Sequence, residues 1–334
     1  MARIVRNLKK RAVKGRNVVL AAGFFDGVHR GHSSVIRKAL ALAKARGARL
    51  WVLTFGAHPR KVLDPDDAPS ILTAPSHKVA LLSELGVYGC IVLRFTARLA
   101  EQSPAAFVAR LARAVPGLRM IVVGENWRFG RGGKGTPQLL SKLGRRHGFE
   151  LLVARPVTWR GAEVSSTRIR GAVAAGKLGE AARMLGRPFS ILGTVIPGRR
   201  IGRTLGLPTA NLDPHNEVRP PEGVYVALAR VSFGWYWGVV NMGVRPTVSP
   251  RGRRASSLEL HIPGVRRNLY GRRVEVFFLA RLRAERAFRS LDALKAQVGR
   301  DIGRARAWLR KEAASGRLKR KMRFGALQET VNRL

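Results

Sequence analysis

The sequence predicts an α/β domain with a doubly wound parallel sheet, followed by a small β-barrel domain that ends in one helix. Three observations predict this division. The chain has 334 residues, and a typical domain has about 150. Between residues 17 and 183, short apolar runs alternate with amphipathic segments, which is typical of parallel strands joined by crossover helices. After the turn Gly186-Arg187-Pro188, apolar runs follow one another with Gly and Pro between them, which is typical of a barrel.

The elements of the first domain follow from this alternation. Strands are expected at residues 18–22, 50–55, 89–95, 120–123 and 150–155, and helices at residues 33–46, 76–85, 104–114, 137–147 and 167–175. The first helix has the clearest pattern, because Val35, Ile36 and Ala39 recur at helical spacing and Ser33 or Ser34 could be its N-cap. Ligands of doubly wound sheets bind at the carboxyl ends of the strands, so functional residues are expected in the loops that follow them.

The elements of the second domain are mostly strands. They are expected at residues 190–196, 223–232, 235–242, 257–261 and 273–280, with one helix at residues 291–309. A basic tail follows, which we expect to be poorly ordered in part. The predicted organisation is therefore a first domain at 1–185, a second at 186–310 and a tail at 311–334.

The composition excludes several classes of protein. A hydrophobic fraction of 46% is enough for sizeable cores and excludes wholesale disorder. Cys90 is the only cysteine, so an intramolecular disulfide is impossible and a cysteine-based zinc site is not expected. No apolar run approaches the ~18 residues of a membrane span. The apolar run at residues 18–25 follows a basic stretch, and together they resemble a signal peptide. Because Asp26 and His29 follow the apolar run at once, we interpret this run as a strand that enters a tight loop. We therefore expect a cytoplasmic protein.

The charge of the chain is unusual. It has 63 Lys and Arg against 20 Asp and Glu, a formal net charge of +43. The excess is divided between the two halves, +23 for residues 1–185 and +20 for residues 186–334. Such a distribution indicates either a surface adapted to polyanions or a bias shared by every protein of the organism, and the sequence leaves both open.

The first candidate site is the run G-F-F-D-G-V-H-R-G-H at residues 23–32, between the first predicted strand and the first predicted helix. Its glycines let the backbone approach a phosphate, and the helix N-terminus offers N–H groups and a partial positive charge. His29 and His32 flank Gly31, so both can donate to phosphate oxygens. The pattern indicates a site that holds a nucleoside triphosphate during attack on its α-phosphorus; the alternative is a Gly-rich turn with two surface histidines.

The second candidate site is the Gly-rich loop at residues 198–211, which ends in P-T-A-N. Its glycines suit a phosphate chain, and the side-chain oxygens of Thr209 and Asn211 are ligands suited to Mg²⁺. Glu259 lies on a predicted strand between apolar neighbours, and it is a rare acid in this chain. The alternatives are a plain β-turn for the loop and a structural partner of a nearby arginine for Glu259.

The run at residues 23–32 resembles the nucleotidylyltransferase signature of the bifunctional riboflavin kinase/FMN adenylyltransferase family, the bacterial FAD synthetases. The resemblance continues in order from about residue 17 to residue 310. The further motifs are T-F-G-A-H-P at 54–59, G-E-N-W-R-F-G at 124–130, S-S-T-R-I-R at 165–170, P-T-A-N at 208–211 and L-E-L-H at 258–261. The departures are Ala57 and Asn268, where proline and aspartate are usual in the family, and Pro263-Gly264, which interrupts the usual end of a strand.

For the first domain, the resemblance implies a Rossmann-like nucleotidylyltransferase that joins FMN to the AMP part of ATP. His29, His32 and Arg168 would stabilise the transition state, and His58 would contact the flavin. The residues expected to bind the nucleotide are Gly23, Phe25, Asp26, Gly31, Asn126, Ser165, Ser166 and Thr167.

For the second domain, the resemblance implies a riboflavin kinase that uses ATP and Mg²⁺. Glu259 would accept the proton of the riboflavin 5′-hydroxyl, Thr209 and Asn211 would hold the metal, and Arg245 would contact the flavin. The glycines expected to cover the ATP phosphates are Gly198, Gly202 and Gly206.

The expected partners are small molecules: ATP, riboflavin and FMN. The charge further predicts weak, non-specific binding of nucleic acid, whereas no membrane association is expected and the oligomeric state is open. Two alternatives remain at this point. One is a catalytically reduced relative that serves as an RNA- or ribosome-associated binding protein; the other is an enzyme with one activity, the adenylyltransferase having been lost where Ala57 departs from the motif.

Overall fold

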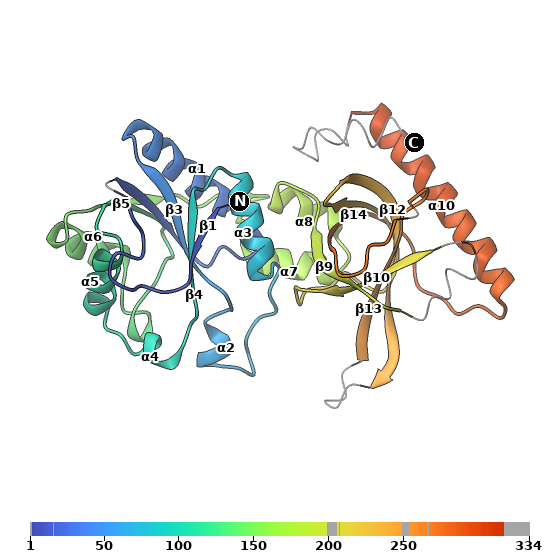
Figure 1. Cartoon of the computed structure of the whole chain (residues 1–334), viewed down its shortest axis with the longest axis horizontal. Helices are drawn as coiled ribbons and strands as arrows, with labels where there is room; N and C mark the ends of the chain where they lie inside the picture. Colours follow the sequence, from blue (N-terminus) through green and yellow to red (C-terminus); the bar gives the residue numbers. More distant parts are fainter. Residues whose placement is uncertain are drawn as a thin grey trace. The chain divides into compact units, whose positions relative to one another are not determined.

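The computed structural model describes residues 2–15, 17–198, 206, 208–248, 254–265 and 267–316, without the side chains of 244–248 and 254–256. The chain forms two compact units, Met1–Ser166 and Thr167–Leu334. Figure 1 shows an α/β sheet in the first unit and a barrel in the second. The two predicted architectures are therefore confirmed.

The first unit is built on a six-stranded sheet in the order β1-β4-β3-β2-β5-β6, in which every pairing is parallel. The strands are β1 (Arg3–Val5), β2 (Val18–Ala22), β3 (Arg49–Phe55), β4 (Gly89–Leu93), β5 (Leu118–Gly124) and β6 (Glu150–Ala154). The chain runs to one side from β2 through β3 and β4, and to the other side through β5 and β6. The order thus reverses between β2 and β5, where sheets of this class bind their ligands.

Helices cover both faces of this sheet. The long ones are α1 (Arg30–Ala45), α3 (Pro75–Glu84), α5 (Pro104–Ala114) and α6 (Pro137–Arg146). The short elements are η1 (Asp26–Val28), α2 (Arg60–Leu63), α4 (Ala97–Ala100), η2 (Arg131–Gly133) and the two-stranded hairpin of β7 (Thr158–Trp159) and β8 (Ala162–Glu163). Figure 1 shows α5 and α6 on one side of the sheet and α1 and α3 on the other. The sheet is therefore doubly wound, as predicted.

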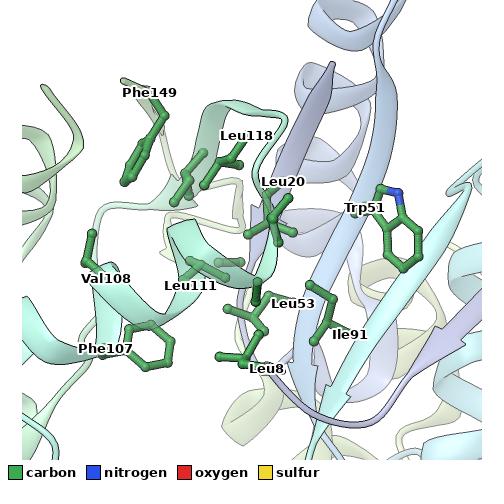
Figure 2. Close-up of a cluster of buried hydrophobic side chains, with 14 of the residues drawn as sticks. Leu8, Leu20, Trp51, Leu53, Ile91, Phe107, Val108, Leu111, Leu118 and Phe149 are labelled. Atoms are coloured by element: carbon green, nitrogen blue, oxygen red, sulfur yellow. The ribbon is translucent and has the colours of Figure 1, made fainter. Parts of the chain in front are cut away.

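Alternate residues of the buried strands supply two separate cores, because successive side chains of a strand point to opposite faces. Leu20 of β2 packs with Phe107 and Leu111 of α5 in the cluster that Figure 2 shows. Its neighbour Val19 belongs to the other cluster, together with Ile36 of α1. Burial on both faces explains why these strands are continuous apolar runs in the sequence.

The second unit contains a closed six-stranded antiparallel barrel in the order β10-β13-β12-β11-β14-β9. The strands are β9 (Ser190–Ile196), β10 (Thr209–Pro214), β11 (Gly223–Val231), β12 (Gly234–Val248), β13 (Arg254–His261) and β14 (Arg273–Arg283). The helices are α7 (Ser166–Ala174), α8 (Leu178–Leu185) and α10 (Leu291–Ala314). The barrel and the C-terminal helix confirm the prediction, while β10 is a strand that the sequence did not predict.

The helix α10 packs against the outer face of β11, β12 and β14 (Figure 1). Val226, Trp237 and Phe277 of these strands form a core cluster with Ala305 and Leu309 of the helix. The helix therefore closes one side of the barrel.

Candidate active sites

The first candidate site is a cavity of about 270 Å³ at the carboxyl ends of β2, β5 and β6. This is the point where the strand order reverses. Eight of the residues expected to bind or activate a nucleotide line the cavity: Gly23, Phe25, His29, Gly31, His32, Asn126, Ser165 and Ser166. Segments that lie more than 100 residues apart in the sequence thus meet at one end of the sheet.

The loop between β2 and α1 is shaped by a left-handed backbone at Phe25 and by a close approach at Gly23. Phe25 has φ +52° although its side chain is only 2% exposed, so burial of the ring offsets the left-handed conformation. At Gly23, a Cβ would lie 2.9 Å from the Phe25 ring. A larger residue there would displace this ring, and Gly23 is therefore required by the close approach rather than by its own φ.

The two histidines form a stacked pair at the N-terminus of α1. His29 is the N-cap, and its Nδ1 accepts a hydrogen bond from the His32 N–H at 3.4 Å. The ring centroids lie 3.5 Å apart with an interplanar angle of 21°. A Cβ at Gly31 would lie 3.2 Å from the His29 ring and 3.4 Å from the Val164 carbonyl oxygen. The glycine thus lets the pair pack against the segment that leads into Ser165.

His32 is a buried imidazole in a positively charged environment. Its pKa lies well below the usual value, firstly because burial disfavours the charged form and secondly because of the positive charges of His29 and Lys78. Its Nδ1 atom is buried and has no hydrogen-bond partner within the described part of the chain. Such an atom costs free energy unless it is hydrogen-bonded, and a ligand in the cavity would supply the missing partner.

Lys78 of α3 also forms hydrogen bonds with the β2–α1 loop, a role that the sequence did not predict. The side chain is 2% exposed, and its Nζ donates to the carbonyl oxygens of Phe24 at 2.8 Å and Phe55 at 3.1 Å. Thr54 Oγ1 also donates to the Phe24 carbonyl, at 2.8 Å. Burial lowers the pKa of Lys78 to about 8, while the charge of Asp26 acts in the opposite direction.

Asp26 lies in the loop but does not line the cavity. Its carboxylate is fully buried and accepts hydrogen bonds at 3.0 Å from the backbone N–H groups of Leu72 and Thr73. The Thr73 hydroxyl donates to it as well, at 3.2 Å. The structure thus gives this carboxylate the role of joining the β2–α1 loop to the segment before α3.

The other expected residues of the first site have specific contacts. Asn126 Nδ2 donates to Glu163 at 3.3 Å, and Ser166 Oγ donates to the Asp26 carbonyl at 3.0 Å. The His58 ring meets the edge of Phe24, with centroids 4.7 Å apart. Thr167 and Arg168 lie in the first turn of α7, within the second compact unit.

The second candidate site is a row of polar side chains across three neighbouring strands of the barrel. Asn211 of β10 lies opposite Glu259 of β13, and Glu259 lies opposite Asn241 of β12. Residues in register across a sheet point to the same face. Thr209 precedes Asn211 by two positions, so it shares this face. The predicted base and the two predicted metal ligands are therefore neighbours, although they lie far apart in the sequence.

Glycine and histidine fix the β10 end of the row. A Cβ at Gly198 would lie 2.0 Å from Asn211 Nδ2, so only glycine allows this approach. His261 lies opposite Thr209 in the β10–β13 ladder, and its Nδ1 is 2.9 Å from the Pro208 carbonyl oxygen. This contact places the backbone immediately before Thr209.

Asn241 and Glu285 extend the row, and the sequence did not single out this pair. Asn241 Nδ2 donates to Glu285 Oε1 at 3.1 Å. Its Oδ1 is buried and has no partner among the residues that the structure describes. A Cβ at Gly243 would lie 2.2 Å from Glu285 Oε1, so Glu285 is closely packed. The available signals were that Asn241 begins a run, residues 241–247, that resembles the kinase pattern, and that Glu285 is an acid in a chain with few acids.

A cavity of about 630 Å³ adjoins Thr209 and is also lined by Gly206 and Tyr270. Gly206 has φ +74°, a conformation that favours glycine. Gly202 lies outside the described residues, as does the side chain of Arg245, whose backbone belongs to β12.

The donor set of the row fits Mg²⁺. Thr209 and Asn211 offer a hydroxyl and an amide oxygen, the hard ligands that this ion prefers. The Gly198 backbone approaches the same face at Asn211, where a phosphate chain would add further oxygens.

Comparisons with known proteins match both halves of the chain. The family model described as FAD synthetase matches residues 12–168, and the one described as riboflavin kinase matches residues 185–309. The chain is 36% identical to the bifunctional riboflavin kinase/FMN adenylyltransferase of Escherichia coli (strain K12), over 90% of this chain and 95% of the relative. A relative of the same name from Pseudomonas fluorescens is 37% identical, over 91% of this chain and 97% of its own.

Among solved structures, the chain is similar to one titled "Crystal Structure of Macrolide-efflux Protein from Streptococcus pneumoniae", with a TM-score of 0.78 and 30% sequence identity. The match covers 91% of this chain and 98% of that one. Among the described residues, no helix has the length and apolar character needed to cross a membrane.

Proposed function

Because the chain belongs to the bifunctional riboflavin kinase/FMN adenylyltransferase family, we propose that it makes FAD in two steps. The first step phosphorylates riboflavin with ATP to give FMN and ADP. The second transfers the AMP part of another ATP to FMN and releases pyrophosphate. The observation that carries the proposal is that the two family models match the two halves of the chain, at residues 12–168 and 185–309.

In the adenylyltransferase step, an oxygen of the FMN phosphate forms a bond to the α-phosphorus of ATP while the bond to pyrophosphate breaks. The α1 N-terminus and the two histidines are suited to stabilise the negative charge of this transition state. The buried Nδ1 of His32 would find its partner in a phosphate oxygen. We assign Arg168 to the departing pyrophosphate, because a guanidinium binds such oxygens bidentately. The phosphate itself is the nucleophile, so no covalent enzyme intermediate is needed.

In the kinase step, we assign Glu259 as the base that accepts the proton of the riboflavin 5′-hydroxyl while the oxygen attacks the γ-phosphorus. Thr209 and Asn211 would hold Mg²⁺, which when bound neutralises charge on the phosphates of ATP. The register supports this division of roles, because Asn211 lies directly opposite Glu259. The base and the metal ligands can therefore act on the two ends of the same transferring group.

The proposed location is the cytoplasm, where ATP, the donor in both steps, is available. Arg245 and His58 remain our proposals for contacts with the flavin. The alternative of a catalytically reduced, RNA-associated relative is not favoured, because the polar row of the barrel and the histidine pair of the sheet are both present.

The direct test is to incubate the purified full chain with riboflavin, ATP and Mg²⁺ and to separate the flavins by chromatography. We expect FMN to appear first and FAD to follow. FMN without FAD would restrict the proposal to the kinase, whereas unchanged riboflavin and no conversion of added FMN would overturn it.

A further inference from the structure

A second hollow in the first unit is lined by four arginines and shares no residue with the 270 Å³ cavity. It has a volume of about 470 Å³, which lies within the usual range for small-molecule sites. Arg6 follows β1, Arg94 follows β4, Arg98 lies on α4 and Arg110 on α5. The guanidinium groups thus come from four separate segments and surround one space.

This hollow lacks acids of the kind that pair with Arg46 and Arg60 in the first unit. None of its lining residues is Asp or Glu, and within the described part of the chain no ion pair involves any of the four arginines. By contrast, the basic hollow around Arg145 contains Glu150, which pairs with Arg46 at 2.9 Å. The four positive charges are therefore left for an anion from solution.

The floor of the hollow is apolar and rigid. Leu8 and Leu93 are each 5% exposed and belong to the core cluster of the sheet, and Leu99 packs against it. The bases of Arg94 and Arg98 are therefore attached to a fixed scaffold. An apolar surface of this kind suits the non-phosphate part of a ligand, because inorganic ions gain nothing from it.

Gln102 adds a polar group that has no partner. Its Oε1 is buried and makes no hydrogen bond within the described residues, although the residue lines the hollow. Its backbone is fixed, since its carbonyl oxygen accepts a hydrogen bond from Arg131 N–H at 2.8 Å. An unpaired buried acceptor requires an N–H or O–H donor, which a nucleobase or a sugar carries.

We propose that this hollow is a binding site for a nucleoside diphosphate or triphosphate, separate from the two candidate active sites. The arginines bind the phosphates, the leucines contact the apolar face of the ligand, and Gln102 accepts from its base or sugar. The proposal does not depend on the proposed function, because no residue of the hollow has a role in either reaction.

The test uses residue-resolved protection from phenylglyoxal, which modifies exposed arginines, with mass spectrometry of the full chain at physiological salt. We expect ADP to protect Arg94 and Arg98, and to leave Arg145 and Arg146 at the end of α6 unprotected. Equal protection of all four would show a diffuse counterion effect and overturn the site, as would no protection or equal protection by adenosine, which has no phosphate.

Variants give the second measurement, equilibrium dialysis with labelled ADP. Arg94→Gln/Arg98→Gln should remove one binding site or weaken it about tenfold or more, with the kcat of both reactions unchanged. The control, Arg145→Gln/Arg146→Gln, removes the same charge from exposed positions and should leave that site intact.

Inorganic tripolyphosphate should bind more weakly than ADP, and Gln102→Leu should abolish this difference. Equal losses in the two double variants, or a preference that survives Gln102→Leu, would contradict the proposal.

Discussion

At the scale of single residues, Glu259 carries the sharpest prediction. Glu259→Gln keeps the shape of the side chain but cannot accept a proton, so FMN formation should fall by about 10²–10⁴-fold. Conversion of added FMN to FAD should remain nearly unchanged, because Glu259 lies on β13 of the barrel and has no role in the proposed adenylyltransferase step. The measurement is the rate of each reaction with its own substrate. Kinase turnover close to that of the wild type would remove Glu259 from the mechanism.

His32→Ala should have the opposite effect. FMN should accumulate and FAD formation should fall by more than about tenfold, because a phosphate partner at the N-terminus of α1 is lost. The matched control is His147→Ala, which removes an exposed histidine at the end of α6. Time courses with riboflavin as the only flavin test both variants. FAD synthesis that survives in His32→Ala would contradict the role given to the histidine pair.

The sequence predicted the residues whose chemistry is local, and missed those whose role depends on tertiary register. The histidines and the P-T-A-N segment are short runs with a recognisable chemical logic. The pairing of Asn241 with Glu285 was not predictable, since these residues lie on different strands and the hydrogen bond between them is a consequence of barrel closure. Likewise, nothing near Asp26 in the sequence indicates that its carboxylate bonds to Leu72 and Thr73.

At the scale of elements, Lys78 ties α3 to the loop that carries the histidines, and it predicts a pH dependence of stability. Its pKa in the folded protein is about 8 against an ordinary value of 10.5. Between these two values, the unfolded chain holds a proton that the folded chain has lost, so stability gained from this residue rises with pH. Below about pH 8 both states are protonated, and the cost of the buried charge is constant.

Lys78→Met should remove this rise. The difference in unfolding free energy between wild type and variant should change in favour of the wild type from pH 7.5 to pH 10, by on the order of 1–3 kcal/mol. Urea unfolding at several pH values measures it, and the titration of other groups cancels in the difference. A difference that is independent of pH would show that Lys78 keeps its ordinary pKa.

Two of the strands that escaped prediction, β1 and β10, did so for clear physical reasons. β1 has three residues, and its Ile4 is 47% exposed at the edge of the sheet; so short a run within a basic segment gives no periodicity. β10 has the sequence T-A-N-L-D-P, whose composition is that of a loop. Its pairing with β9 and β13 rather than its own propensity makes it a strand.

The helix α8 gives a prediction about the boundary between the units. The proposed division lies between residues 185 and 186, whereas the second compact unit begins at Thr167. Leu178, Ala181 and Met184 of α8 are buried, and the helix contacts β14. A fragment of residues 167–334 should therefore unfold at a higher temperature than one of 186–334. Equal melting temperatures would show that α8 contributes nothing to the barrel unit.

At the scale of the whole molecule, the net charge of +43 predicts weak RNA binding without sequence preference. Each phosphate contact releases counterions, so the affinity should fall steeply as salt increases. Fluorescence titrations with unrelated RNAs at two salt concentrations measure this. We expect similar affinities for all RNAs at low salt and a large loss at high salt. Sequence-selective or salt-insensitive binding would instead favour a dedicated RNA partner.

The closure of the barrel has a consequence for how a newly made chain assembles. β9, the first barrel strand in the sequence, completes the ring by pairing with β14, the last. During synthesis, the pairing of β9 with β14 must wait until residue 283 has left the ribosome. The sheet of the first unit, by contrast, is complete at residue 154. Contacts between distant segments also form slowly. The half that finishes FAD is thus assembled before the half that makes its FMN, so an enzyme interrupted late in synthesis would depend on FMN made by finished copies.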